Sequence, residues 1–427
     1  MTDLTQGSSS IWTSQAAVRN RKRRYAADRR LRLIGAGAIA LAMVLLGTLI
    51  FSIVATGWPA FLQTRIGLEV DVDPQHVDGE NAARGNFRAL VQNSIVAALP
   101  PDARDDERAA ATILSNGAQL MLRDRIIADP GLIGETVEIE IPASDPFDQL
   151  AKGTISRDTP ESFRRVTDRQ IAWWDHLVAS GRVSTHFNWG LFFNADSRFP
   201  ELAGLAGAII GSFLALLVCF LLSFPLGITA AVYLEEFARR NRWTDLIEVN
   251  INNLAAVPSV VFGLLGLVVF IGWFGLPRSA PLVGGMVLSL MTLPTIIIAT
   301  RAALKSVPPS IREAALAIGA SKHEMVLHHV LPLAMPGILT GTIIGLAQAL
   351  GEAAPLLLIG MNAFITSTPE GVLNPATALP TQIFIWADSP ERGFVARTSA
   401  GIMVLLGFLL VMNAIAIYLR HRFERRW

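Results

Sequence analysis

The stretch PPSIREAALAIGASKHEMVLHHVLP, residues 308–332, decides the fold, because this polar-flanked segment lies between two apolar runs of membrane length. Its spacing predicts two short helices joined by a tight turn. Ser310–Glu313 and Ser321–Glu324 each have the form of a capping box at a helix start. Gly319 stands where the first helix needs a left-handed C-terminal residue. Helices of about two or three turns are not stable alone in water, so the pair must pack on another surface.

The first of these helices is expected to offer a small apolar face to that surface. The face consists of Ile311, Ala314, Ala315 and Ile318. Residues three and four apart lie on one side of a helix, so these four side chains are predicted to act together.

Composition indicates a membrane protein. Of 427 residues, 52% are hydrophobic and 17% are charged, whereas soluble domains carry about 25% charged residues. The first of six apolar runs is too long for a signal peptide, so it is predicted to be a membrane anchor. Each of the six runs is long enough to cross about 30 Å of hydrocarbon: Leu33–Gly57, Leu202–Leu234, Val249–Pro277, Ser279–Thr300, Val330–Leu358 and Thr398–Leu419. We therefore expect an all-α polytopic membrane protein with six transmembrane helices.

Basic residues are segregated along the chain, and this predicts its orientation. Eight of them lie within Arg19–Arg32, three follow the second run at Arg239, Arg240 and Arg242, and four close the chain at Arg420, Arg422, Arg425 and Arg426. The positive-inside rule then places both termini and the loop 305–332 in the cytoplasm. Residues 1–32 and 420–427 are predicted to be basic cytoplasmic tails, the first of them disordered.

Residues 58–201, between the first and second runs, are numerous enough for a domain of their own. Alternation at 66–72 and 137–141 predicts strands, and 108–128 and 161–180 predict amphipathic helices. Long loops cross the membrane largely regardless of charge, so we expect a periplasmic α+β domain. The aromatic residues Trp173, Trp174 and 187–193 fit a partner surface, a core or a membrane interface.

The pattern Glu313-Ala314-Ala315, then Gly319, then Leu331-Pro332 resembles the EAA loop of ABC-importer permeases. In that family the loop docks on a cytoplasmic ATPase. His329 departs from the pattern, because the family usually has an aliphatic residue there. The resemblance implies that the following residues couple to the ATPase: Arg312, Glu313, Ala314, Ala315, Gly319, Ser321, Leu331 and Pro332.

Four further stretches narrow the resemblance to phosphate-importer permease subunits of the PstA type. They imply a type I ABC-importer permease core at 202–419, with five transmembrane helices and the loop 305–332. A domain inserted before that core is also similar to one in some proteobacterial members. The stretches are Ala256–Gly266, Pro336–Gly341, Leu350–Leu358 and Ala378–Ile383.

Polar residues within the apolar runs are candidates for the translocation path. Glu352 is the only acidic residue deep inside a run, and Gln348 lies one helical turn before it. Such residues are costly in lipid and are functional candidates, although a carboxylate would repel an anion. The alternative for Glu352 is a structural hydrogen-bond partner for a broken helix. Ser259, Thr292 and Thr295 would add a neutral, hydrogen-bonding lining.

Glycines and prolines in the runs leave two alternatives open. Gly337, Gly341 and Gly345 predict close helix packing, either within this chain or with a second subunit. Prolines are predicted to interrupt five of the runs, as a wet path requires: Pro225, Pro258, Pro294, Pro332, Pro336 and Pro355.

Three positions depart from the family. Related permeases often carry Arg where this chain has Ile298 and Gln348, and Glu where it has Arg301. A charged path therefore cannot be carried over to these positions. For Arg301 the alternative is a side chain that reaches from the span to the membrane surface.

Energy for transport must come from another polypeptide. Moving each negative charge inward costs about 2.3 kcal/mol per 100 mV, and the chain has no G-x-x-x-x-G-K-[ST] loop for ATP. We expect no catalytic residue, metal or cofactor in this chain, with ATP and Mg bound by the partner. The resemblance implies three partners in the bacterial inner membrane and periplasm: a PstC-type second permease, a PstB-type ATPase dimer and a PstS-type phosphate-binding protein.

Other functions remain open at this point. An importer permease for sulfate, molybdate or an organic ion would share the same loop. A membrane sensor or scaffold is less favoured, because the inner segments are all about 30 residues or shorter and offer no output domain. A metal-dependent intramembrane enzyme is disfavoured, because His323, His328 and His329 form no H-E-x-x-H pattern.

Overall fold

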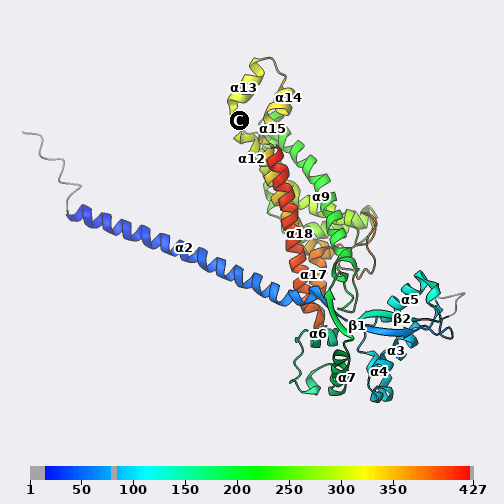
Figure 1. Cartoon of the computed structure of the whole chain (residues 1–427). Coiled ribbons are helices and arrows are strands. Elements are labelled where there is room, and N and C mark those ends of the chain that lie inside the picture. The colour runs from blue at the N-terminus through cyan, green and yellow to red at the C-terminus, as the bar shows by residue number, and fades with distance from the viewer. Residues whose placement is uncertain (1–14, 78–83, 424–427) are drawn as a thin grey trace, which may run out of the picture. The chain divides into compact units, whose positions relative to one another are not determined.

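The computed structural model describes residues 15–77 and 84–423 (Figure 1). Among these residues five helices are long and apolar enough to cross a membrane. The count is six if one bent pair of helices crosses as a single span. The five are α2 (Gln15–Gly57), α9 (Ala206–Val232), α12 (Pro281–Ser306), α15 (Leu331–Gly351) and α18 (Gly393–Phe423).

The third predicted span is not one helix. It consists of α10 (Arg242–Ala255), then α11 (Ser259–Leu265) continuing into the π-helix η7 (Gly266–Trp273). The two parts meet at 103°. Pro258 is the N-cap of α11, and because proline has no backbone N–H to continue the ladder, it fixes the break there.

Most of the other prolines do not interrupt their helices. Pro225, Pro294 and Pro336 lie inside α9, α12 and α15, which continue through them. Pro355 lies in the first turn of the short helix α16 (Ala354–Leu358). The prediction of five interrupted spans was therefore wrong, since neighbouring helices and Ser or Thr side chains can satisfy the freed carbonyls. For example, Thr229 donates to Pro225 O at 2.8 Å.

The first helix begins earlier than predicted. The α2 helix starts at Gln15 and includes the basic residues of 19–32, so the expectation of a disordered tail was wrong for residues 15–32. The rest of the predicted N-terminal tail, residues 1–14, lies outside the described residues, as do residues 424–427 at the C-terminal end.

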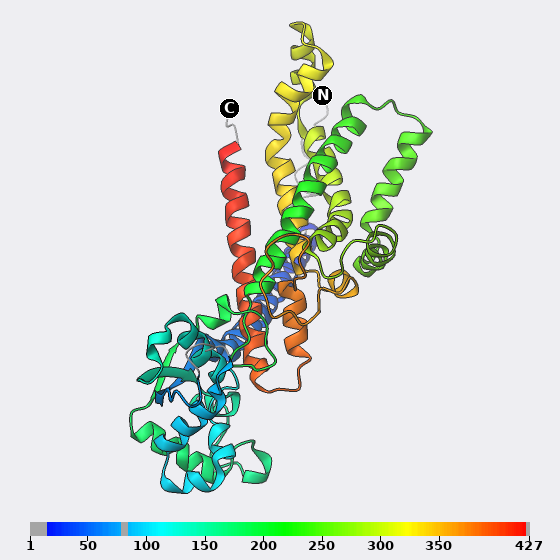
Figure 2. The same cartoon turned by 90° about the vertical axis from the view of Figure 1, so that its right-hand side faces the viewer.

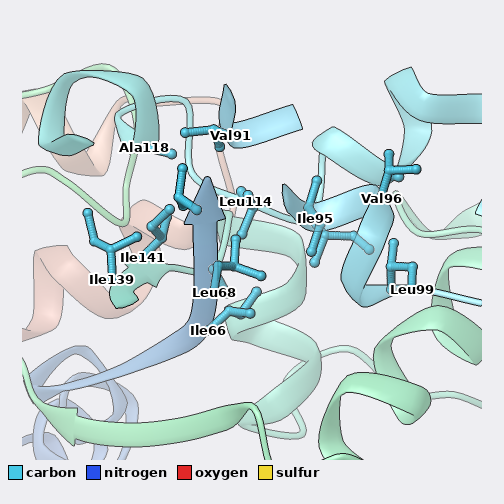
Figure 3. Packing of buried hydrophobic residues seen from close by; sticks show 14 of the residues in the cluster. Ile66, Leu68, Val91, Ile95, Val96, Leu99, Leu114, Ala118, Ile139 and Ile141 are labelled. Atoms are coloured by element: carbon cyan, nitrogen blue, oxygen red, sulfur yellow. The ribbon is translucent and has the colours of Figure 1, made fainter. Parts of the chain in front are cut away.

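The predicted strands are confirmed, and a third strand joins them. β1 (Leu62–Asp71) pairs antiparallel with β2 (Thr136–Pro142) on one side and β3 (Val183–Phe187) on the other. Ile66 lies opposite Ile141, and Leu68 lies opposite Ile139. These side chains point into one core, shared with the neighbouring helices (Figure 3).

The helices of this segment cover the same core. One predicted helix, 108–128, is in fact two, because residues 112–117 turn between them. The other, 161–180, begins as a helix only at Asp168, where Thr167 and Gln170 form a capping box. The α-helices are α3 (Phe87–Ala98), α4 (Glu107–Ala111), α5 (Ala118–Ala128), α6 (Asp145–Ala151), α7 (Asp168–Ala179) and α8 (Gly190–Phe193), with 3₁₀ turns η1 (Trp58–Phe61), η3 (Pro101–Asp106), η4 (Pro130–Leu132) and η5 (Glu161–Phe163).

Residues 56–427 form one compact unit. Within it residues 58–201, which we call the sheet-bearing segment, are held to α17 (Leu379–Ala387) and α18. Trp386 donates to Asp196 at 3.1 Å, and Arg165 forms an ion pair with Glu391, two residues before α18. Burial raises the pKa of the Asp196 carboxyl. Helices and sheet together agree with an α+β segment, but its limits at 58–201 remain a prediction.

Candidate functional site

The loop between α12 and α15 lies at the opposite end of these helices from the three-stranded sheet (Figure 2). Its first helix, α13 (Pro309–Ala317), has Pro308 as N-cap without a side-chain cap. Ser310 is already inside the helix, so the first predicted capping box was wrong. The two prolines set the helical φ angle at its start instead.

The turn after α13 is as predicted. Gly319 has a φ of +92°, and its N–H donates to Leu316 O at 3.0 Å. The N–H of Ala320 reaches back to Ala315 O at 3.1 Å. These hydrogen bonds end the helix at a residue in the left-handed conformation, which glycine adopts at the lowest free-energy cost.

The second helix of the loop is the beginning of a span. Ser321 caps α14 (Lys322–Glu324) and forms the predicted box with Glu324, whose carboxylate accepts from Ser321 N at 2.8 Å. The helix continues through the π-turn η8 (Met325–Val330) into α15. Leu331 and Pro332 therefore lie in the first turn of α15 rather than after a separate helix.

The predicted apolar face of α13 is buried in part and exposed in part. Ala315 is buried and Ile311 half-buried against the cluster that contains Met325, Val326 and Val330. Ile318 is 82% exposed. The exposed residues between Glu313 and Gly319 are Glu313, Ala314, Leu316, Ala317, Ile318 and Gly319, which we call the loop tip.

Arg312 is engaged inside the chain. It donates to Glu236 at 2.7 Å, to Leu304 O at 2.9 Å and to Val307 O at 2.7 Å. Glu236 belongs to the π-turn η6 (Tyr233–Phe237), which ends the α9 helix. Its side chain is only 6% exposed, so this charge-assisted pair fixes α13 against the end of α9.

Glu235, the residue before Glu236, forms ion pairs with α12. Glu235 accepts from Arg301 of α12 at 3.4 Å and lies 3.6 Å from Lys305. Arg301 also pairs with Glu248 of α10 at 2.9 Å. Arg301 therefore forms ion pairs with glutamates of η6 and α10. Neither the family resemblance nor the alternative of a side chain that reaches the membrane surface predicted these pairs.

Lys322 completes this arrangement, because its ammonium lies 5.3 Å from the ring centre of Phe237. We call Glu235, Glu236 and Phe237 the η6 hub, since they contact α12, α13 and α14 directly, and α10 joins them through Arg301. Sequence reasoning missed the hub. The only available signal was a pair of glutamates at the end of an apolar run, just before the cluster of arginines at 239–242.

The helix α15 presents three distinct sides. On one side Gly337 and Gly341 face Ala303 and Ala299 of α12, where added Cβ atoms would come within 2.7 and 2.1 Å. Gly345 also faces α12. The glycine stripe therefore serves packing within this chain, which decides between the two alternatives left open by the sequence.

The second side of α15 lines an apolar cavity of about 240 Å³ shared with α9 and α18. Leu346 and Leu350 are among its lining residues, and none of the predicted path residues is. An anion would gain no hydrogen bonds from the apolar chains that dominate this lining, so the cavity does not fit a translocation path.

The third side of α15 carries Gln348, which is exposed one turn after the exposed Ile344. Glu352 is half-buried and forms the C-cap of the helix. The other predicted path residues differ in setting. Thr295 and Ser259 are half-buried, whereas Thr292 is buried and donates to Ser289 O at 3.2 Å.

Two breaks in the helices come together near Glu352. The α16 helix begins just after it and packs on α11, which begins at Ser259. An added Cβ at Gly263 would lie 2.7 Å from Pro355 Cα. The close approach brings two interrupted segments into contact, where backbone groups can face a wet path. The transport roles of these residues remain predictions.

Residues 223–427 match the family described as "Binding-protein-dependent transport system inner membrane component". A probable ABC transporter permease protein, YqgI of Bacillus subtilis, is 32% identical over 58% of this chain and 88% of its own length. The phosphate transport system permease protein PstA of Yersinia pestis is 35% identical, covering 50% of this chain and 71% of that one. PstA 2 of Mycobacterium bovis is 34% identical, covering 60% and 83%.

The chain belongs to this family of inner-membrane transport components. It is a multi-pass permease of the PstA type, as the EAA pattern indicated, and its relatives are named as permeases rather than enzymes. Residues 18–161 match a separate "Domain of unknown function (DUF3333)". The MetNI methionine ABC transporter in inward facing conformations has a TM-score of 0.39 to this chain at 16% identity, covering 52% of this chain and 95% of that chain.

Proposed function

We propose that this chain is the permease subunit of an ATP-driven importer for inorganic phosphate. The observation that carries the proposal is its 34–35% identity to PstA proteins of two organisms across at least 71% of their length. The loop geometry supports it, because an exposed, capped helix end at one end of the helices is what a docking ATPase requires.

Coupling to ATP would run through the loop tip. Ile318 and Leu316 are the exposed apolar side chains there, and burying them against an ATPase groove would contribute about 25 cal/mol per Å² of apolar surface. Because Arg312 joins α13 to the η6 hub, a displacement of the tip would be passed to α9, α10 and α12 together.

The path would lie along the third side of α15. A glutamine side chain facing lipid is unfavourable, so the exposed Gln348 calls for a polar partner or water. We infer that a second, PstC-type permease covers Ile344 and Gln348, and that Gln348 donates to the passing anion. Glu352 would hold a group of that partner, because a free carboxylate would repel phosphate.

The complete importer would contain further components. A PstB-type ATPase dimer would bind ATP and Mg, and a PstS-type periplasmic protein would deliver phosphate. Residues 58–201 would form the outer α+β domain of this permease. Two cytoplasmic termini with six crossings require that the bent pair α10 and α11 cross the membrane as one span.

Labelled-phosphate uptake in a strain that lacks this gene tests the proposal. Restoring the gene should restore phosphate uptake, and the restored strain should show no gain in the uptake of labelled sulfate. Gln348→Leu keeps bulk but removes the donor, so uptake should fall severalfold while the ATPase still co-purifies. Gln348→Arg, which restores a charge common among relatives, should retain more uptake than Gln348→Leu.

Ile344→Leu on the same side of α15 is the matched control and should transport normally. Sulfate or another solute transported in place of phosphate would contradict the proposed substrate. If Gln348→Leu transports as well as the unaltered chain, Gln348 serves packing and not the path.

A further inference from the structure

Six aromatic rings form a continuous cluster at one end of the sheet. Neighbouring ring centres lie between 4.8 and 6.4 Å apart. The rings come from η1, the end of β3 and the short helix α8. We call them the aromatic foot: Trp58, Phe61, Phe187, Trp189, Phe192 and Phe193.

Four of the six rings of the aromatic foot are exposed. Trp189 is 62% exposed and Phe193 is 72% exposed, and Trp58 and Phe187 are also exposed, whereas Phe61 and Phe192 are half-buried against the cluster that contains Leu191. By contrast, Trp173 and Trp174, which the sequence did not distinguish from these rings, are fully buried in the core that also contains Ile66 of the sheet. An apolar patch of adjoining rings is not normally left in water, so the foot requires a cover.

The chain fixes where this surface lies. Trp58 directly follows Gly57, the last residue of the apolar helix α2. Asn188 ties the β3 end to the same place, because its N–H donates to Phe61 O at 2.8 Å and its side chain donates to Ala60 O at 3.0 Å. Leu62 pairs with Phe187 at the start of the sheet. The foot therefore lies where the chain leaves a membrane span.

Charge argues for lipid as the cover. Residues 187–194 contain no charged side chain, although 58–201 holds 22 acidic and 14 basic residues. A segment with this acidic excess gains nothing from anionic headgroups. Uncharged rings, in contrast, are the side chains that settle at the membrane–water boundary, where their apolar faces leave water.

We propose that the aromatic foot sits in the headgroup layer of the outer leaflet and anchors the sheet-bearing segment to the bilayer surface. The anchor complements the polar contacts to α17 and α18, and together they would hold the segment in one orientation over the permease. The proposal goes beyond phosphate transport and holds for any transported solute.

Depth-dependent quenching in the full chain tests the anchor. Phe193→Cys in a Cys219→Ala background would carry an environment-sensitive fluorophore, with the protein reconstituted in phosphatidylcholine vesicles. Phe163→Cys is the matched control, because Phe163 is 78% exposed on the same segment but outside the foot. Nitroxides attached at the lipid headgroup should quench the label at 193 severalfold more than the label at 163. Nitroxides near the chain ends should quench both labels weakly.

Equal, weak quenching at both positions would overturn the proposal, because the foot would then lie in water or against protein. Stronger quenching at 193 by the deep nitroxides would also overturn it, since the rings would then lie in hydrocarbon. A Trp189→Cys label gives an independent reading if the variant at 193 is poorly produced, and it must show the same shallow preference.

Discussion

Gly319 is the residue on which the direction of the loop depends. Its φ of +92° is unfavourable for a side chain, yet among the described residues no heavy atom lies within 4 Å of an added Cβ. Within the part of the chain that the structure describes, backbone conformation is therefore the obstacle to substitution. The left-handed region costs most residues about 1 kcal/mol, and asparagine less than alanine.

We accordingly expect Gly319→Ala to weaken ATPase co-purification and uptake more than Gly319→Asn does, although alanine is smaller. Co-purification from membranes and uptake by the same cells are the measurements. Equal behaviour of the two variants would show that the left-handed turn does not control docking.

Asp196 illustrates a second effect at the residue scale, that of burial on a charge. Its folded-state pKa is raised because burial disfavours the carboxylate. Its stabilising contribution is therefore fully present below the unfolded-state pKa, about 3.9, and is lost as the pH rises through the folded-state value. Asp196→Asn preserves an acceptor for Trp386 but removes the titration.

The difference in melting temperature between Asp196→Asn and the unaltered chain should thus increase in favour of the variant from pH 4 to pH 8. Thermal unfolding of the purified protein in detergent measures it. An opposite slope for Asp196→Asn, or none, would refute the assignment.

At the scale of elements, the contact between α13 and the η6 hub is the connection that matters most for coupling. Glu236 is nearly buried and receives Arg312 through two nitrogen atoms. Removing one member of a buried pair costs about 3–5 kcal/mol, because the remaining charge is left without compensation. The orientation of the loop therefore depends on Glu236 at the end of α9, which lies 76 residues before Arg312 in the chain.

Arg312→Glu and Glu236→Arg should each reduce the phosphate imported per ATP hydrolysed, and the double exchange should recover part of it. Arg312→Lys should be intermediate, because lysine retains the charge but not the planar fork of donors. The ratio of uptake to ATP hydrolysis in reconstituted vesicles is the measurement. Absence of any recovery in the exchange, with the protein correctly inserted, would show that the pair is not the connection.

At the scale of the whole molecule, the sheet-bearing segment and the loop tip lie at opposite ends of the unit formed by residues 56–427 (Figure 2). Reagent accessibility from the outside should therefore distinguish them. Ser115 is unsuitable for such a label, because its side chain is buried and donates to Glu201 at 2.8 Å.

Ser162 and Ser310 are both exposed and offer a matched pair. In intact spheroplasts, Ser162→Cys should react with an impermeant thiol reagent and Ser310→Cys should react only after lysis. The reverse order would invert the topology, including the side on which the loop meets an ATPase.

The sequence by itself determined the features that depend on neighbours along the chain. Hydrophobic length predicted five of the six spans, alternation predicted β1 and β2, and the need for a left-handed residue predicted Gly319. The capping box of Ser321 and Glu324 is equally local. These features follow from the periodicity and conformational preferences of a few consecutive residues, so no tertiary information was needed.

Only the tertiary structure decided which side of each helix faces which neighbour. It placed the glycines of α15 against α12, buried Thr292, and turned Arg301 and Arg312 toward glutamates of η6. It also separated the buried Trp173 from the exposed Trp189. The physical reason is that side-chain burial and ion pairing are set by residues distant in sequence, and a span that is apolar all round does not reveal its packed side.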